Sequence, residues 1–317
     1  MRYFVTGGAG FIGSNLADTL LLEGHEVVVY DNLSTGCIEF IVKAKDNPKF
    51  KFIQGDLLDF NLLSEAIKSS DFIYHLAANA DIRLGTAHPE KDLEQNTVAT
   101  FNLLEAMRIN HIYRIAFASS SAIYGETKIF PTPEDAPLPI QTSLYGASKL
   151  AAEGLIQAYC EGFDFQAWIF RFVSVLGERY YHGHVFDFYK KLLTNPDELY
   201  VLGDGHQKKS YLYVRDCVAA MQISIRYSQA KVNIFNLGID GYCEVNDSIL
   251  WITQHLGLAP ILKYSGGRQG WVGDNPWVFL DTTKICQLGW RPELSIEAAI
   301  IQTLTFLENN RWLLEKR

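Results

Sequence analysis

The sequence has few cysteines, and none of them are paired at metal-binding or redox spacing. Five occur in 317 residues, and no two have the C-x-x-C spacing. A zinc site or a dithiol centre would need close pairs, and a disulfide framework would need an even set. We therefore expect reduced thiols, no metal site and a cytoplasmic location.

Long apolar runs and an excess of positive charge are also missing. No run reaches the length that spans a membrane, and Met1 to Tyr3 lead directly into a strand pattern, so we expect no signal peptide. Lys and Arg number 28 against 36 Asp and Glu, a formal net charge of −8. This balance argues against nucleic acid as a main partner. The length and the hydrophobic content of 48% are those of a globular protein with a large core.

A glycine-rich turn stands near the N-terminus, between an apolar run and an amphipathic one. Gly7, Gly10 and Gly13 let backbone N–H groups at a helix N-terminus approach a pyrophosphate. Asp31 ends the next strand pattern, about 20 residues later, where a carboxylate binds a ribose diol. No cation for a 2′-phosphate follows before Lys43, which favours NAD over NADP. The alternative is a tight turn with a solvated aspartate after it.

Apolar runs alternate with helical patterns through the first half. This alternation predicts an α/β fold, a Rossmann-like doubly wound parallel sheet. The expected strands are 2–6, 26–30, 50–54, 71–75, 113–118 and 166–170, and the expected helices are 12–23, 60–68, 92–109 and 144–161. Later patterns predict helices at 185–194, 214–228, 244–256 and 294–313 and strands at 199–202 and 233–237. We expect an NAD-binding domain over 1–175 and a smaller, mostly helical substrate-binding lobe mainly over 176–317, with the chain crossing between them.

The carboxyl ends of the strands should line the cofactor site, as in other open parallel sheets. The cofactor-binding residues expected from the glycine turn, the first helix and the strand ends are Gly7, Gly10, Phe11, Ile12, Gly13, Asp31, Asn32, Asp56, Leu57, Leu76, Ala77, Ala78 and Ser119.

A tyrosine and a lysine lie four residues apart at the start of a helix pattern. Tyr145 and Lys149 therefore share one helix face. The ammonium is expected to lower the pKa of the phenol, which could then act as a general base, and to reach a ribose hydroxyl of the cofactor. Ser119, Ser120 and Ser121 follow an apolar strand, and a hydroxyl there can hold the oxygen that Tyr145 deprotonates. The alternatives are an ordinary surface pair and a serine-rich cap.

With these motifs in this order, the chain resembles the extended short-chain dehydrogenase/reductases. Within them it is most similar to the NAD-dependent sugar-nucleotide epimerase/dehydratase family, closest to UDP-glucose 4-epimerases. The resemblance covers essentially the whole length, on the stretches Thr6–Gly13, His75–Ala78, Ser119–Gly125, Tyr145–Lys149, Asp281–Lys284 and Leu288–Pro292. It implies that Ser120 is the catalytic serine beside Tyr145 and Lys149, and that Asn96 supports the cofactor region.

The resemblance also bears on the type of reaction. Family dehydratases carry an Asp–Glu pair after the catalytic serine or threonine, and decarboxylases a Glu, where this chain has Ser121 and Ala122. Alanine cannot transfer a proton. The implied reaction is epimerisation at C4 of a UDP-hexose through a 4-keto sugar. A UDP-uronic acid 4-epimerase, a sugar-nucleotide reductase and a non-enzymatic NAD-sensing scaffold remain as alternatives.

The implied substrate-binding residues are Ser121, Tyr145, Ser174, Lys209, Arg268 and Trp277. Lys209 stands where the family has an arginine on the diphosphate, and Arg268 lies one residue from a second such position. Ser174 replaces a family asparagine, and Trp277 falls near a position that limits the C2 substituent. Both cations could instead be solvated loop residues.

The family often dimerises through two helices of each subunit. The stretches 92–109 and 144–161 are the candidates here, so the resemblance implies a homodimer.

Overall fold

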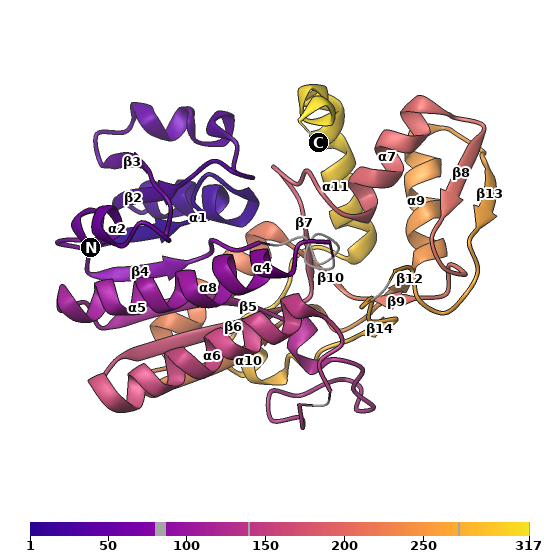
Figure 1. Cartoon of the computed structure of the whole chain (residues 1–317). Coiled ribbons are helices and arrows are strands. Elements are labelled where there is room, and N and C mark those ends of the chain that lie inside the picture. The colour runs from indigo at the N-terminus through magenta and orange to yellow at the C-terminus, as the bar shows by residue number, and fades with distance from the viewer. Residues whose placement is uncertain (80–86, 139, 272, 317) are drawn as a thin grey trace. The chain divides into compact units, whose positions relative to one another are not determined.

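The computed structural model describes residues 1–79, 87–138, 140–271 and 273–316 of the chain (Figure 1). The chain forms two compact units, each built from three separate segments. Unit 1 comprises 1–123, 143–171 and 221–235, and unit 2 comprises 124–142, 172–220 and 236–317. The assignment of cofactor binding to 1–175 and of substrate binding to 176–317 stays a prediction.

Unit 1 is built on the seven-stranded sheet of the chain, in the order β11-β6-β5-β4-β1-β2-β3. Neighbours from β3 to β5 pair in parallel. This order confirms the predicted doubly wound, Rossmann-like sheet. The strands are β1 (Arg2–Thr6), β2 (Glu26–Asp31), β3 (Phe50–Gln54), β4 (Phe72–His75), β5 (Arg114–Ser120), β6 (Gln166–Phe172) and β11 (Val232–Leu237), the last ending in unit 2.

Helices α2, α5 and α6 cover one face of this sheet. Their apolar residues, such as Leu63, Leu103 and Ile156, share one buried cluster with Phe4 and Ile115 of the strands. Continuous apolar strands of this kind are typical of parallel sheets covered by helices. The helical elements of unit 1 are α1 (Phe11–Leu22), η1 (Ile38–Ile41), η2 (Lys43–Asp46), α2 (Phe60–Ala66), α4 (Pro89–Asp92), the π-helix η3 (Leu93–Val98), α5 (Ala99–Ile109) and α6 (Leu144–Phe163).

The first-half predictions agree with these elements, and the main difference lies in the predicted helix 92–109. The structure divides that stretch into the last residue of α4, the π-helix η3 and helix α5. A π-turn adds a residue to the helical repeat, which an apolar pattern of period 3.6 does not reveal.

Unit 2 contains the helices predicted for the second half together with short strands. The helical elements are α7 (His184–Thr194), α9 (Val245–Leu256), α10 (Thr283–Gln287), α11 (Ile296–Asn309) and η5 (Arg311–Glu315), while η4 (Ser121–Tyr124) and α8 (Val214–Tyr227) run from one unit into the other. The strands are β7 (Ser174–Leu176), β8 (Glu198–Val201), β9 (Lys208–Lys209), β10 (Tyr211–Tyr213), β12 (Cys243–Glu244), β13 (Ile261–Tyr264) and β14 (Trp277–Val278). Several have only two or three residues, too few for an alternating pattern to predict them.

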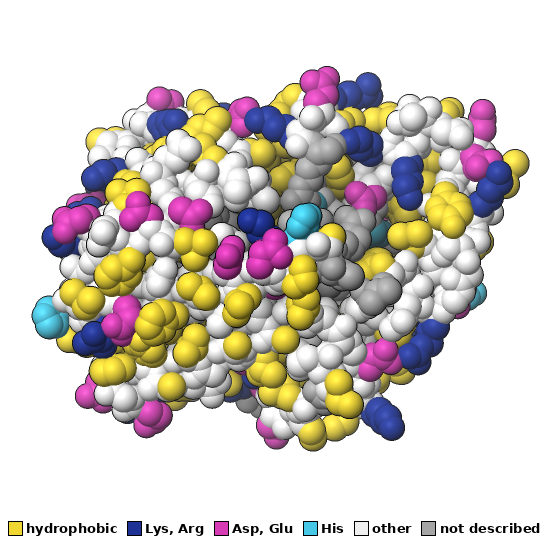
Figure 2. Space-filling view, in the orientation of Figure 1, with side chains coloured by type: hydrophobic (Ala, Val, Ile, Leu, Met, Phe, Trp, Pro, Cys, Tyr) yellow, Lys and Arg dark blue, Asp and Glu magenta, His cyan; other side chains and the backbone are white. Residues whose placement is uncertain are grey.

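The surface and the cysteines agree with the composition. Lys and Arg side chains lie among Asp and Glu side chains on the face that Figure 2 shows, so charges of both signs are mixed there. All five cysteines are free. Within the described ranges, no helix is long and apolar enough to cross a membrane, and no cluster of three His, Cys, Asp or Glu could hold a metal ion.

Candidate active site

The glycine turn joins β1 to α1 and leaves no room for side chains. Gly7 has a φ of +67°, and a Cβ on it would lie 2.7 Å from the backbone nitrogen of Ala77. A Cβ on Gly13 would collide with the carbonyl oxygen of Gly7. Gly10 is the N-cap of α1, and its N–H donates to that same oxygen at 3.0 Å. The glycines thus bring the end of β1, the start of α1 and the chain after β4 into close contact.

Asp31 at the end of β2 is fixed against this turn. Its Oδ2 accepts a hydrogen bond from the N–H of Ala9 at 2.9 Å, and its Oδ1 accepts one from the N–H of Leu33 at 2.8 Å. Burial raises the pKa of Asp31, and the two backbone hydrogen bonds act in the opposite direction. Each carboxylate oxygen has a second lone pair, which leaves both able to accept from a diol.

The other predicted cofactor residues lie around the same strand ends. Asn32 donates from Nδ2 to Oδ2 of Asp56 at 2.8 Å, and this contact joins the ends of β2 and β3. Leu57 is buried directly after Asp56, while Leu76, Ala77 and Ala78 follow β4. Phe11 and Ile12 begin α1.

The turn fits a dinucleotide. Helix α1 has twelve residues and no acidic residue in its first turn, so its N-terminus favours an anion. The absence of Cβ atoms on Gly7 and Gly13 keeps the backbone N–H groups accessible at close range. The Asp31 carboxylate lies beside the turn at the place expected for a ribose diol, so the residues present are those that an NAD site needs.

The phenol of Tyr145 meets the side chain of Ser120. Ser120 ends β5, and Tyr145 lies in the first turn of α6, where Oγ of Ser143 caps the helix by accepting from the N–H of Gly146 at 3.0 Å. A hydrogen bond joins the side chains of Tyr145 and Ser120. Two of the predicted catalytic residues, which are far apart in sequence, are thus brought together in unit 1.

The prediction that Lys149 lowers the pKa of Tyr145 is wrong for this structure. Burial raises the pKa of Tyr145 to about 12, the hydrogen bond from Ser120 opposes this rise, and Asp92 adds to it. Lys149 is one turn further along α6, but its Nζ donates to the carbonyl oxygen of Ala118 at 2.8 Å. The ammonium is therefore held on β5 and does not perturb the phenol.

Lys149 itself is buried among charged side chains. Burial lowers the pKa of its ammonium to about 7, while Glu153 and then Asp92 raise it. Glu153 accepts from Nε and from a terminal nitrogen of Arg171 at 3.1 and 2.8 Å, and also from Oγ of Ser119. The sequence analysis missed Glu153, although its position four residues after Lys149 places it on the same helix face.

His75 was part of a motif that carried the resemblance, and the structure gives it a packing role. Its Nδ1 lies 2.8 Å from Oγ1 of Thr6 and its Nε2 lies 2.9 Å from Oγ1 of Thr100. Burial, and then the charge of Lys149, lower its pKa to about 3. The neutral imidazole therefore ties β1 to α5 behind the glycine turn.

Asn96 lies in the π-helix η3 and connects three segments. Its Oδ1 accepts from the N–H of Asn79, and its Nδ2 donates to Oγ of Ser148 on α6, both at 2.9 Å. The predicted supporting asparagine is thus attached to the chain after β4 and to the helix that carries Tyr145.

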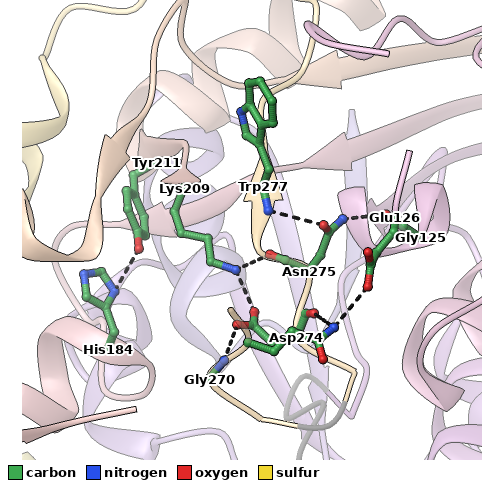
Figure 3. A network of polar contacts seen from close by, with 10 residues as sticks. Gly125, Glu126, His184, Lys209, Tyr211, Gly270, Asp274, Asn275 and Trp277 are labelled. Atoms are coloured by element: carbon green, nitrogen blue, oxygen red, sulfur yellow. Dashed lines mark hydrogen bonds and ion pairs between the residues drawn. The ribbon is translucent and has the colours of Figure 1, made fainter. Parts of the chain in front are cut away.

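In unit 2, Lys209 is held by an acidic partner (Figure 3). Its Nζ lies 2.6 Å from Oδ1 of the buried Asp274 and also donates to the carbonyl oxygen of Asn275. The other carboxylate oxygen of Asp274 accepts from the N–H of Gly270 at 2.9 Å. Lys209 is therefore an ordered cation in a pair, unlike the free loop cation that the alternative reading predicted.

Arg268 lies on the same loop and pairs with Glu126 at 2.6 Å. Both of these side chains are exposed to solvent. Gln269 donates from Nε2 to Oε1 of Glu126 at 3.0 Å and to the carbonyl oxygen of Asp274 at 3.1 Å. The amide thus connects the pair that holds Arg268 to the pair that holds Lys209.

The remaining predicted substrate residues lie in different places. Trp277 begins β14, stacks on Phe130 with ring centroids 3.9 Å apart, and has the ammonium of Lys208 5.0 Å from its own ring centroid. Ser174 is exposed at the start of β7, and Ser121 begins η4 directly after Ser120. The structure joins neither of these serines to Lys209 or Arg268 by a hydrogen bond within its described part.

Comparisons with known proteins agree with this geometry. A model of the NAD-dependent epimerase/dehydratase family matches residues 3–238. A putative UDP-glucose 4-epimerase of Methanocaldococcus jannaschii is 33% identical over 313 residues, which cover 96% of this chain and 98% of that protein.

Two solved structures have the same fold over nearly the full length. A UDP-galactose 4-epimerase is 39% identical with a TM-score of 0.89, covering 98% of this chain and 100% of that one. A UDP-glucuronic acid 4-epimerase from Bacillus cereus, in complex with UDP-glucuronic acid and NAD, is 26% identical with a TM-score of 0.89 and the same coverage. The chain belongs to the NAD-dependent epimerase/dehydratase family.

Proposed function

We propose that this protein binds NAD and interconverts UDP-hexoses of the glucose and galactose type by epimerisation at C4. The observation that carries the proposal is the hydrogen bond between Tyr145 and Ser120, with Lys149 one helical turn away and the glycine turn in the same unit. The M. jannaschii relative and the UDP-galactose 4-epimerase support the substrate class.

The catalytic residues have distinct roles in this proposal. Tyr145 takes the proton of the sugar hydroxyl and later returns it, while Ser120 holds the same oxygen by a hydrogen bond. Lys149 places a positive charge near the cofactor ribose. NAD, held by Gly7, Gly10, Gly13 and Asp31, supplies the hydride acceptor and donor.

The residues after Ser120 favour a redox-neutral reaction. Ser121 and Ala122 begin η4, and neither offers a carboxyl group for the elimination of water. The sugar can therefore only regain its hydrogen, on either face of the 4-keto carbon. This chemistry changes configuration and leaves the composition of the sugar nucleotide unchanged.

The diphosphate of the substrate is assigned to Lys209 and Arg268. Each cation already has a carboxylate partner, Asp274 and Glu126 respectively, so an incoming anion would share or replace that partner. A UDP-uronic acid substrate is the second candidate, because the B. cereus structure of the same fold holds UDP-glucuronic acid.

We also propose a cytoplasmic homodimer. The free cysteines support the location. The dimer is supported by exposed apolar side chains on η3, α5 and α6, which include Leu93, Phe101, Ile109 and Phe163. Hydrophobic side chains gather over α5 and α6 in Figure 2, and patches of this kind mark protein interfaces. The molar mass in solution of the wild type and of Phe101→Glu tests this, and a monomeric wild type would contradict it.

A panel of sugar nucleotides tests the activity. Purified protein is incubated with UDP-glucose, UDP-galactose, UDP-glucuronic acid and UDP-N-acetylglucosamine, and the products are separated. We expect the C4 epimer of UDP-glucose or UDP-galactose to form fastest. Exclusive turnover of UDP-glucuronic acid would replace the hexose assignment, and no turnover of any member would contradict the enzyme assignment.

A further inference from the structure

A buried carboxylate lies behind the first turn of α6. Asp92 is the last residue of α4, and only 1% of its surface is exposed. Its Oδ1 accepts hydrogen bonds from Nδ2 of Asn79 at 2.9 Å and from Nδ2 of Asn96 at 3.4 Å. A buried carboxylate is costly to keep unless it is held and used, which makes its place in the molecule informative.

A continuous series of hydrogen bonds leads from Asp92 to the backbone of Tyr145. Asn96 contacts Asp92 and also donates to Oγ of Ser148, and Oγ of Ser148 in turn donates to the carbonyl oxygen of Tyr145 at 2.8 Å. The π-helix η3 begins directly after Asp92 and carries Asn96. π-turns of this kind occur most often at functional sites.

Asp92 also acts on the charges of the catalytic pair. It raises the pKa of the Tyr145 phenol and that of the Lys149 ammonium. In the described ranges, the other charged or titratable groups around this pair are Glu153 on α6, its partner Arg171 on β6, and His75 on β4, whose imidazole is neutral.

We propose that Asp92 is a positioning residue of the catalytic site, which holds the first turn of α6 through Asn96 and Ser148 and places a buried negative charge behind Tyr145 and Lys149. This inference rests on the proposed function, because it gives Tyr145 and Lys149 their catalytic roles. The carboxylate touches neither substrate nor cofactor in this proposal.

The negative charge has a directional consequence. Because Asp92 favours the protonated form of both groups, its removal should let both lose their protons at lower pH. A residue that only supports the fold would change the height of a pH profile and leave its two limbs in place.

The first test measures the protonation of Lys149 without any substrate. Wild type, Asp92→Asn and Glu94→Gln are labelled with isotopic lysine, and the Lys149 resonance is identified by its loss in Lys149→Met. We expect the titration midpoint to fall by about 1 pH unit in Asp92→Asn. Glu94 lies two residues away in η3, and its matched loss of one charge should leave the midpoint unchanged. Equal midpoints in all three proteins would overturn the role of the charge.

The second test uses turnover of the UDP-sugar. In Asp92→Asn, both limbs of the profile of kcat/KM against pH should move to lower pH, whereas Ser148→Ala, which keeps the charge and breaks the link to Tyr145, should lower kcat about 10-fold or more with the limbs in place. Limbs fixed in Asp92→Asn, or an unchanged kcat in Ser148→Ala, would contradict the proposal. If Asp92→Asn does not fold, Ser148→Ala decides alone. Absence of turnover in the wild type would instead contradict the proposed function, and the lysine titration would still stand.

Discussion

The ammonium of Lys149 donates a hydrogen bond to the carbonyl oxygen of Ala118 at 2.8 Å, two residues before Ser120 on the same strand. This contact fixes a buried cation beside the strand end that carries the catalytic serine. Tyr145 reaches the same strand end through its hydrogen bond to Ser120. Helix α6 therefore delivers both of its catalytic side chains to the last turn of chain in β5.

Replacing Tyr145 by Phe should remove the general base and leave the ring packing. We expect turnover to fall by about 10²–10⁴-fold, the usual contribution of such a group. Binding of NAD, measured by calorimetry, should persist because the glycine turn and Asp31 are unchanged. Turnover close to that of the wild type would remove Tyr145 from the mechanism.

Asp31 should determine the choice of dinucleotide. Asp31→Asn keeps the size of the side chain and removes its charge, so the affinity for NAD should fall while discrimination against NADP relaxes. Binding of both dinucleotides is measured for the variant and for Asp46→Asn, a surface control in η2. A wild type that prefers NADP, or a variant with unchanged selectivity, would contradict this role.

The two cations of unit 2 should behave differently when each is removed. Arg268→Ala loses an exposed pair, so we expect little change in stability but a KM for the sugar nucleotide raised about 10-fold, since a charge-assisted contact contributes roughly 1.5–3 kcal/mol. Lys209→Met leaves the buried carboxylate of Asp274 without its partner and should cost about 3–5 kcal/mol of stability in addition.

Thermal melts and steady-state kinetics of these two variants, with NAD affinity as the control, separate the effects. An unchanged KM in both variants would mean that neither cation binds the diphosphate. An unchanged melting temperature in Lys209→Met would mean that its pair with Asp274 is not a stabilising one.

His75 should make the protein less stable in acid. The pKa of His75 is lowered to about 3 in the folded protein by burial, whereas an unfolded imidazole takes a proton near pH 6.5. Below that pH the unfolded state binds more protons, so the free energy of unfolding should fall by up to about 1.4 kcal/mol per pH unit. His75→Gln should lose this dependence, and the exposed control His111→Gln should keep it. Urea unfolding at pH 7 and pH 5 measures both, and equal slopes in the two variants would contradict the assignment.

The sequence predicted the sheet well because its strands are buried on both faces and its helices have long apolar stripes. The glycine turn, Asp31, Ser120 and Tyr145 could also be predicted, since local spacing and strand ends carry their signal. The pairing of Lys209 with Asp274 could not, because 65 residues separate the two and the strand that carries Lys209 has only two residues.

The direction of the Lys149 side chain was also beyond sequence reasoning. A separation of four residues places Tyr145 and Lys149 on one face, but the rotamer of Lys149 depends on the carbonyl oxygen of Ala118, which only the folded sheet presents. For the same reason the pKa values of this pair depend on Asp92 and on burial, which no local pattern records.

The composition of the products tests the epimerase assignment most directly. Purified enzyme is given UDP-glucose or UDP-galactose without added cofactor, and the products are analysed by mass spectrometry and the solution by its NADH absorbance. We expect many turnovers, a product of the same mass as the substrate that differs at C4, and no accumulation of free NADH. A product lighter by one water, or consumption of NADH in equal amount to the sugar, would contradict epimerisation and favour a dehydratase or a reductase.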